Sequence, residues 1–382
     1  MKKNMPFQLK NILVITSIIT ILFTSSCNNS GPGCLEYSEI RQESIKIPAL
    51  EFNPESYICY RAEGINIDGL LDEDSWKDTD WTNDFVDIEG DLKPAPLHRT
   101  RAKMLWDEDY LYIAAELTEP HIWAKLRQRD TVIFYDNDFE VFIDPDGDTH
   151  EYMEFEMNAF NTIWDLLLTK PYRDHGRVAD AWNINGIKTA VKIYGTLNDP
   201  SDRDEKWVVE LAFPFDVLTE FGDFPKDKSR WRINFSRVNW RTVIENGKYI
   251  KEINPETGRV FPEYNWVWSP QGLINMHYPE TWGYLQFSEI KAGEGSADLV
   301  PSADEQLKWI LRTLYYAQRK FAEENSKYTD DINELKKYGY LNNDYKPCIL
   351  IKPLGYECYL MSDKSGKTWI LDDSGRIYSR NN

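Results

Sequence analysis

Apolar and polar residues alternate along much of the chain between residues 57 and 289. Residues 101–106 and 110–117 each place apolar side chains at every second position, and the acidic turn 107–109 separates them. Because successive side chains of a strand point to opposite faces, this pattern predicts a β-hairpin with one apolar face.

A second hairpin is predicted around the turn 145–148. Residues 138–144 place Phe139, Val141 and Ile143 on one face, and residues 151–159 do the same with Met153 and Phe155. Further strands are expected at 189–194, 206–213, 231–238 and 282–287. Short strands with frequent turn signals indicate a mainly β fold, an antiparallel β-sandwich of the immunoglobulin or jelly-roll type over residues 57–289.

The pattern changes after residue 289. Residues 290–301 are rich in Gly, Ala and Ser and predict a linker. Apolar residues then recur at helical spacing from Leu307 to Phe321, after Ser302 and Glu305, which could form a capping box. A short helix at 329–338 and strands at 348–351, 356–361 and 368–371 complete a small C-terminal α+β domain, residues 302–382.

The first residues have the features of a secretory signal peptide. Lys2, Lys3 and Lys10 precede an apolar run, residues 12–23, that is too short to span a bilayer. The run ends at Thr24-Ser25-Ser26-Cys27, which resembles the lipobox of bacterial lipoproteins. This resemblance implies an exported protein, anchored in the bacterial cell envelope through lipid on Cys27, with residues 28–56 as a tether and lead-in. Ordinary cleavage and secretion is the alternative.

The overall charge of the chain limits its possible binding partners. The formal net charge of −19 argues against a nucleic-acid partner, since phosphate binding needs clustered Lys and Arg.

Four cysteines remain besides Cys27, in a compartment where disulfides persist. These four are Cys34, Cys59, Cys348 and Cys358, and they allow three connectivities. Cys348 and Cys358 are the more attractive pair because they lie in adjacent predicted strands.

The second hairpin also predicts an acidic outer face. If Val141 and Phe155 point inward, then Glu140, Glu154 and Glu156 point outward, where carboxylates could accept hydrogen bonds from sugar hydroxyls. The alternative is that these acids pair with basic residues of neighbouring strands, namely Arg101, Lys103, Arg232 or Arg237. Aromatic platforms for the apolar face of a sugar could come from Phe134, Tyr135 and the segment 266–268.

Four stretches together resemble carbohydrate-binding module family 9. They are Ile-Asp-Gly-Leu-Leu-Asp-Glu at 67–73, Leu-Trp-Asp-Glu-Asp-Tyr-Leu-Tyr at 105–112, Asp-Asn-Asp-Phe-Glu-Val-Phe-Ile-Asp at 136–144 and Trp-Gly at 282–283. The resemblance covers residues 57–289. It implies a non-catalytic β-sandwich that holds a sugar between two aromatic rings, with polar side chains around the rim and structural calcium nearby.

Carried over by position, the resemblance places the first ring at Phe134 or Tyr135 and the rim acid at Glu140. It also marks departures, because Glu156 stands where a rim arginine is expected. Ser236 or Arg237 stands where a glutamine is expected, and Met276-His277 stand where the second tryptophan is expected. Any sugar is therefore expected to be held differently from the family's usual clamp.

The acidic turn suggests a possible calcium site. Asp144, Asp146 and Asp148 offer several oxygens from a tight turn, as hard cations prefer. The run does not fit an EF-hand loop, because Phe155 stands where the twelfth-position acid is needed. A plain acidic hairpin turn is the alternative.

These observations favour non-catalytic carbohydrate binding by a cell-envelope lipoprotein that supports polysaccharide capture or catabolism, beside polysaccharide-degrading enzymes. One alternative is a glycoside hydrolase using the outward carboxylates, although the pattern gives no reason for any of them to have a raised pKa. Another is a surface structural or adhesion protein without a sugar ligand. Haem ligation by Met276 and His277 is disfavoured, because adjacent strand residues point oppositely.

The C-terminal domain resembles the soluble part of type IV pilin-like proteins, on the residues Leu311 to Gln318, Tyr328 and Leu335 followed by short strands. It lacks the long apolar stalk helix that drives pilin assembly. We therefore expect a docking or spacer domain rather than a polymerising one.

Overall fold

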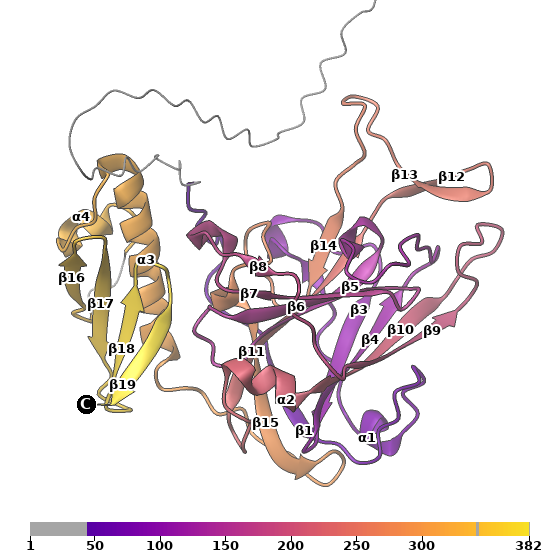
Figure 1. Cartoon of the computed structure of the whole chain (residues 1–382), viewed down its shortest axis with the longest axis horizontal. Helices are drawn as coiled ribbons and strands as arrows, with labels where there is room; N and C mark the ends of the chain where they lie inside the picture. Colours follow the sequence, from indigo (N-terminus) through magenta and orange to yellow (C-terminus); the bar gives the residue numbers. More distant parts are fainter. Residues whose placement is uncertain (1–43, 341–343, 382) are drawn as a thin grey trace, which may run out of the picture. The chain divides into compact units, whose positions relative to one another are not determined.

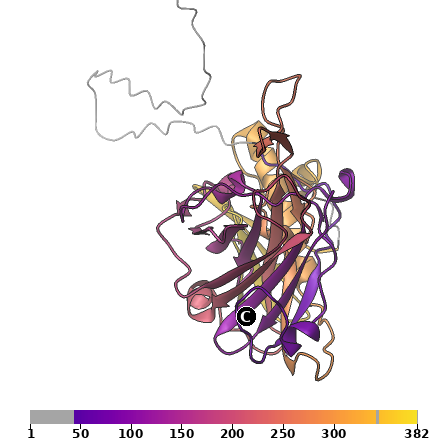
Figure 2. The same cartoon turned by 90° about the vertical axis from the view of Figure 1, so that its right-hand side faces the viewer.

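The computed structural model describes residues 44–340 and 344–381, so the predictions for Cys27, Cys34 and the leader lie outside the described residues. The described residues fall in one unit, residues 42–382. A single curled sheet of 13 strands makes up the main domain (Figures 1 and 2). No helix in the described ranges is long and apolar enough to cross a bilayer.

The curled sheet forms the two layers of a β-sandwich. One layer contains β5 (Asp138–Asp144), β6 (Tyr152–Asn158), β7 (Ile163–Leu168), β8 (Val178–Ala179), β11 (Arg230–Asn239), β14 (Tyr264–Val267) with β2 (Val86–Asp87), and β15 (Gly283–Lys291). The other contains β1 (Ser56–Arg61), β3 (Thr100–Trp106), β4 (Tyr110–Thr118), β10 (Lys206–Pro214) and β9 (Lys188–Tyr194). Figure 1 shows β5, β6 and β7 crossing the direction of β3, β4 and β10. The predicted mainly β sandwich is confirmed.

Alternation along the strands fills the space between the layers. Val141, Ile143 and Phe155 are at most 1% exposed and belong to one apolar core with residues of β3, β4 and β10. The rings of Phe155 on β6 and Phe213 on β10 meet edge to face at 5.3 Å, which joins the two layers directly. The predicted inward faces of both hairpins are therefore confirmed.

The pairing departs from a purely antiparallel sandwich in one place. Strand β1 pairs in parallel with both β15 and β3, so the first strand closes the gap between the two layers. Strands β1, β7 and β14 were not predicted. Residues 163–168 read Ile-Trp-Asp-Leu-Leu-Leu, and such a nearly continuous apolar run has no clear period. Minor elements are α1 (Asp74–Lys77), α2 (Phe215–Leu218) and the ribbon β12 (Thr242–Glu245) with β13 (Lys248–Lys251).

The C-terminal region forms the predicted helix-and-sheet unit. Helix α3 (Glu305–Asn325) and the short helix α4 (Ile332–Lys336) share an apolar core with the four-stranded sheet β16 (Cys348–Lys352), β17 (Gly355–Met361), β18 (Lys367–Asp372) and β19 (Ile377–Asn381). The predicted capping box is wrong. Asp304 is the residue before α3, and the Glu305 carboxylate instead contacts Arg232 at 3.3 Å and the Tyr284 hydroxyl.

Buried ion pairs join α3 to two short turns of the sandwich, η3 (Tyr172–Asp174) and η5 (Pro279–Thr281). Asp174 accepts from the Tyr315 hydroxyl at 2.5 Å and pairs with Arg319. Glu280 accepts from the Tyr316 hydroxyl at 2.5 Å and pairs with Arg173 at 2.9 Å. The 172–174 turn is thus fixed by side chains of the C-terminal helix.

The predicted disulfide between Cys348 and Cys358 is not formed. Cys358 pairs with Ile349 across β16 and β17, so the neighbouring Cys348 points to the opposite face of the sheet. Cys348 is exposed, whereas Cys358 and Cys59 are buried, and all three are free thiols. Adjacent strands alone could not reveal this one-residue offset.

We expect Cys348 to be the readily alkylated one of these three thiols in the native protein. Burial raises the pKa of Cys358 and Cys59 well above the usual thiol value, which keeps both unreactive. Iodoacetamide labelling followed by peptide mapping checks this, and Cys358 should label only after denaturation. If Cys348 and Cys358 were both protected from labelling and a reductant exposed both, the two cysteines would form a disulfide after all.

Candidate functional site

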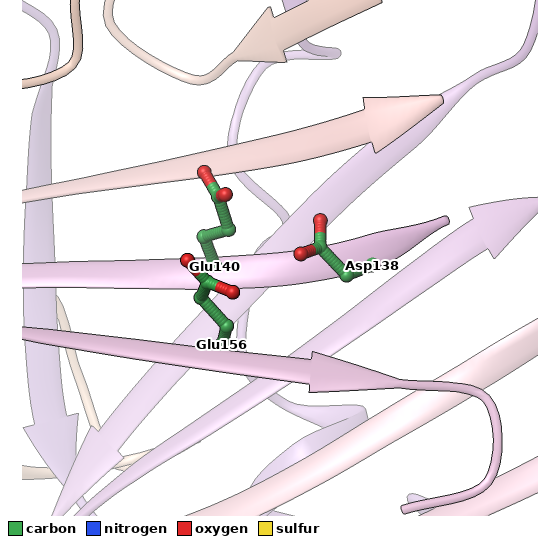
Figure 3. A group of neighbouring side chains, drawn as sticks. All are labelled: Asp138, Glu140 and Glu156. Carbon is green, nitrogen blue, oxygen red and sulfur yellow. The ribbon is translucent and has the colours of Figure 1, made fainter. Parts of the chain in front are cut away.

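The outward side chains of β5 and β6 form an acid cluster, defined here as Asp138, Glu140, Glu154 and Glu156. In the register of the two strands Glu140 lies directly opposite Glu156. Carboxylate oxygens of Asp138, Glu140 and Glu156 lie within 4.8 Å of one another. Figure 3 shows Asp138 and Glu140 on one strand and Glu156 on its neighbour, with the carboxylates close together. The predicted acidic outer face is present.

These acids are far more buried than an outward position suggests. Glu140 and Glu154 keep 5% and 7% of their surface exposed, and Asp138 and Glu156 lie beneath them at 0% and 1%. Burial raises the pKa of Glu140 to about 7, with the Glu263 carboxylate adding to the shift. Burial, then the charge of Glu140, raises the pKa of Glu154 and Glu156 well above the usual range. The expectation of unshifted acids is therefore wrong.

Basic side chains of neighbouring strands do not neutralise the cluster. Within residues 44–340 and 344–381 no salt bridge reaches any of its four members. The four basic residues considered as partners are engaged elsewhere: Arg101 with Glu116, Lys103 with the Trp76 carbonyl, Arg232 with Glu305 and Arg237 with Glu119. The ion-pairing alternative is therefore not realised.

Aromatic rings border the cluster from two directions. Phe134 and Tyr135 lie in the turn η2 (Ile133–Tyr135), where the Phe134 amide donates to Glu156 at 3.0 Å and the Tyr135 ring is 56% exposed. Trp164 on β7 lies directly opposite Glu156 in the register and is half-buried. Tyr172 is 46% exposed, and its pKa is raised to about 12 by burial and by the charges of Glu154 and Glu156.

The residues expected at the second ring position have different environments. Met276 is buried against Phe142 and Trp282 and accepts a 3.0 Å hydrogen bond from Gln271 on its sulfur, so it offers no open platform. The His277 ring contacts the Tyr172 ring edge to face at 4.5 Å. Burial lowers the pKa of His277 to about 3, so this imidazole is neutral. Here Tyr172, supported by His277, is the exposed ring.

The two residues expected at the glutamine position are separated by the sheet. Ser236 lies opposite Glu140 on β11 and faces the cluster. Arg237 points into the interior, where it is fully buried and bonded to Glu119 at 2.6 Å and to Thr100 at 3.0 Å. Trp266 and Trp268 are also interior, at 1% and 2% exposed. Arg237 and both tryptophans of the 266–268 segment are thus corrected from the candidate site to the core.

The acidic turn is held by the chain's own donors. Asp144 accepts from the amides of Gly147 and Thr149, each at 2.9 Å, and Asp148 accepts from Arg376 at 2.6 Å. Oxygens of Asp144, Asp146 and Asp148 lie within 4.8 Å of one another, and burial raises the pKa of all three. Calcium in this turn stays a prediction.

Some site residues lay outside the predicted set. Trp164 was missed because β7 itself was not predicted, although alternation from Glu156 across a third strand would have placed it. Tyr172 was missed because its position depends on the bonds from α3 to Asp174. Asp138 shares the parity of Glu140 along β5, so that signal was available.

Part of the main domain is similar to known proteins. The sequence model of the family described as "Carbohydrate family 9 binding domain-like" matches residues 67–221. A curated relative, "Exoglucanase XynX" of Acetivibrio thermocellus, is 28% identical over 156 residues, which cover 40% of this chain and 12% of the relative. The matched part is thus a small fraction of that longer protein.

Similar solved structures have low identity. A putative carbohydrate-binding protein from Bacteroides uniformis has a TM-score of 0.45 at 14% identity and covers 62% of this chain and 100% of its own. A family 9 carbohydrate-binding module from Caldicellulosiruptor kristjanssonii, in complex with cellotriose, has a TM-score of 0.40 at 14% identity, covering 65% and 100%. The main domain is thus a β-sandwich, and residues 67–221 within it match the carbohydrate-binding module family 9 model.

Proposed function

We propose that this protein binds carbohydrate, without cleaving it, on the outer face of β5, β6 and β7. The observation that carries the proposal is the acid cluster, which has no basic partner from the described chain and is bordered by the rings of Trp164, Tyr172, Phe134 and Tyr135. Carboxylates accept hydrogen bonds from sugar hydroxyls, and flat rings cover the C–H face of a pyranose.

The family match supports the same ligand class. The module from Caldicellulosiruptor kristjanssonii is described in complex with cellotriose and, in a second structure, with glucose. We therefore propose a glycan or oligosaccharide as the ligand. We further propose an exported protein, lipid-anchored at Cys27 in the cell envelope, that captures polysaccharide beside degrading enzymes.

Replacing Trp164 with alanine is expected to weaken glycan binding at least about tenfold, because stacking rings dominate the contact area with a sugar. A glycan array followed by titration calorimetry of the strongest hit measures the loss. Trp81→Ala is the matched control, since Trp81 is also half-buried but lies against Arg101 on the other layer. Equal losses in both variants would contradict a site on β5, β6 and β7.

A glycoside hydrolase is the second candidate, because the Glu140 pKa of about 7 suits a general acid. Both hydrolytic mechanisms, however, need two carboxyl groups that flank the bond to be cleaved, whereas Asp138, Glu140 and Glu156 gather at one point, with oxygens within 4.8 Å of one another. Incubating the protein with the polysaccharides that it binds, and then measuring new reducing ends, distinguishes a hydrolase from a binding protein. Sustained turnover that Glu140→Gln abolishes would establish the hydrolase.

A further inference from the structure

The acid cluster brings four buried carboxyl groups together, and burial and mutual repulsion raise their pKa values, so that they ionise only with difficulty in the absence of a cation. Four carboxyl groups share a buried patch, and the hydrogen bonds that reach it come from backbone amides: Phe134 to Glu156 at 3.0 Å and Val238 to Asp138 at 3.2 Å. Like charges at this spacing repel strongly in a low-dielectric site. A ligand that brings a positive charge would relieve that repulsion.

Two buried polar atoms on this face have no hydrogen-bond partner among the residues that the structure describes. One carboxylate oxygen of Asp138, Oδ2, is fully buried and accepts no hydrogen bond. The Ser236 hydroxyl, directly opposite Glu140, is also fully buried; it lies near enough to lower the pKa of Glu140 but forms no hydrogen bond of normal geometry. Because unpaired buried polar groups are costly, both atoms indicate that a hydrogen-bonding ligand completes the site.

The nearby basic groups of the described chain do not supply the missing charge. The Lys251 ammonium lies 3.2 Å from the centre of the Trp240 ring, in a cation–π contact, and the charge of Asp138 is only a minor influence on its pKa. Arg237 is on the other face of the sheet and pairs with Glu119. His277 is held neutral by burial. Within residues 44–340 and 344–381, none of these groups is therefore a positive partner of the cluster.

The bordering rings decide what kind of cation fits. Trp164 lies beside Glu156 across the strands, and the Tyr172 hydroxyl is close enough to Glu154 and Glu156 for their charges to raise its pKa. A bare metal ion binds oxygen ligands and gains nothing from aromatic rings, whereas the C–H face of a sugar packs against them. Resting on the proposed function, we propose that the site selects sugars with a free ammonium group, such as the glucosamine units of a de-N-acetylated polysaccharide.

The test compares three trisaccharides with the same backbone: β-1,4-linked glucosamine, its N-acetylated form and cellotriose. Titration calorimetry of the whole protein is run near neutral pH, at which both a protonated amine and ionised carboxylates can form, with a chelator present. We expect glucosamine trisaccharide to bind at least about tenfold more tightly than either neutral form. Glu156→Gln and Glu154→Gln should each lower the ratio of glucosamine affinity to cellotriose affinity, because the loss of a carboxylate weakens the ammonium contact more than a hydroxyl contact.

A control separates the site from general attraction, because the chain has a net charge of −19. Glu205→Gln removes one charge at an exposed position and should leave the amine preference intact. Neutral sugars that bind as tightly as glucosamine would overturn the inference and leave the proposed function standing. Loss of the amine preference in Glu205→Gln would also overturn it. Failure of all three sugars would overturn both proposals.

Discussion

Replacing Glu280 with glutamine is expected to destabilise the folded chain by about 3 to 5 kcal/mol, the usual cost of breaking a buried ion pair by removing one partner. Glu280 is 6% exposed and pairs with Arg173 at 2.9 Å and with Arg312 at 3.8 Å. Glutamine keeps the shape but leaves two guanidinium groups buried without this anion. Urea denaturation at neutral pH measures the loss.

The same variant has a predictable pH dependence. Burial pushes the pKa of Glu280 upward, but Arg173, Arg312 and the Tyr316 hydroxyl outweigh it and hold the pKa at about 2. A lowered pKa contributes stability that is present above about pH 4.5 and is lost as the pH falls toward 2. The difference between the two proteins should therefore shrink in acid.

An exposed ion pair provides the control. Glu334→Gln removes a partner of Lys337 at 2.8 Å in a pair with side-chain exposures of 41% and 64%, and should cost about 0 to 1 kcal/mol. If Glu280→Gln cost no more than this control, the buried pairs would not be what holds α3 against the sandwich.

Replacing Glu140 with glutamine is expected to stabilise the ligand-free protein by about 1 to 3 kcal/mol at pH 8. The pKa of Glu140 rises from 4.5 to about 7 on folding, so between these values the unfolded chain binds fewer protons and stability falls as the pH rises. Glutamine removes that penalty. Thermal unfolding across about pH 4 to 8 should show no gain at the acidic end.

Glu116→Gln is the opposite case on the other layer. Burial raises the pKa of Glu116, but Lys206 and Arg101 outweigh it and the net pKa is lowered. This variant should therefore lose stability at neutral pH, the reverse of Glu140→Gln. A loss in both variants at pH 8 would show that Glu140 has a positive partner in the folded protein.

The fold was predictable where side chains alternate. Strands β3, β4, β5 and β6 were expected within one residue of their observed ends, because each carries an apolar face of period two. Strand β7 was missed since its residues are apolar on both sides, and the parallel pairing of β1 depends on contacts between residues more than 40 positions apart. Local pattern carries no information about such pairings.

The site was predictable only in part, for the same reason. The parity of Glu140, Glu154 and Glu156 followed from one hairpin, and the structure confirms it. Their burial did not follow, because it depends on segments outside the hairpin, such as the 133–135 turn, whose Phe134 amide donates to Glu156. The second aromatic ring, Tyr172, lies on a turn fixed by Arg319 and Tyr315 of the C-terminal helix, so no motif within the sandwich could indicate it.

The central claim is that a sugar binds against the acid cluster on β5, β6 and β7. A crystal structure of the whole protein with the strongest ligand from the glycan array tests it most directly. We predict a sugar ring in contact with the Trp164 or Tyr172 ring, with its polar groups bonded to Glu140 and Glu154. A sugar bound elsewhere, for instance beside Trp81 on the other layer, with the acid cluster empty, would contradict the account.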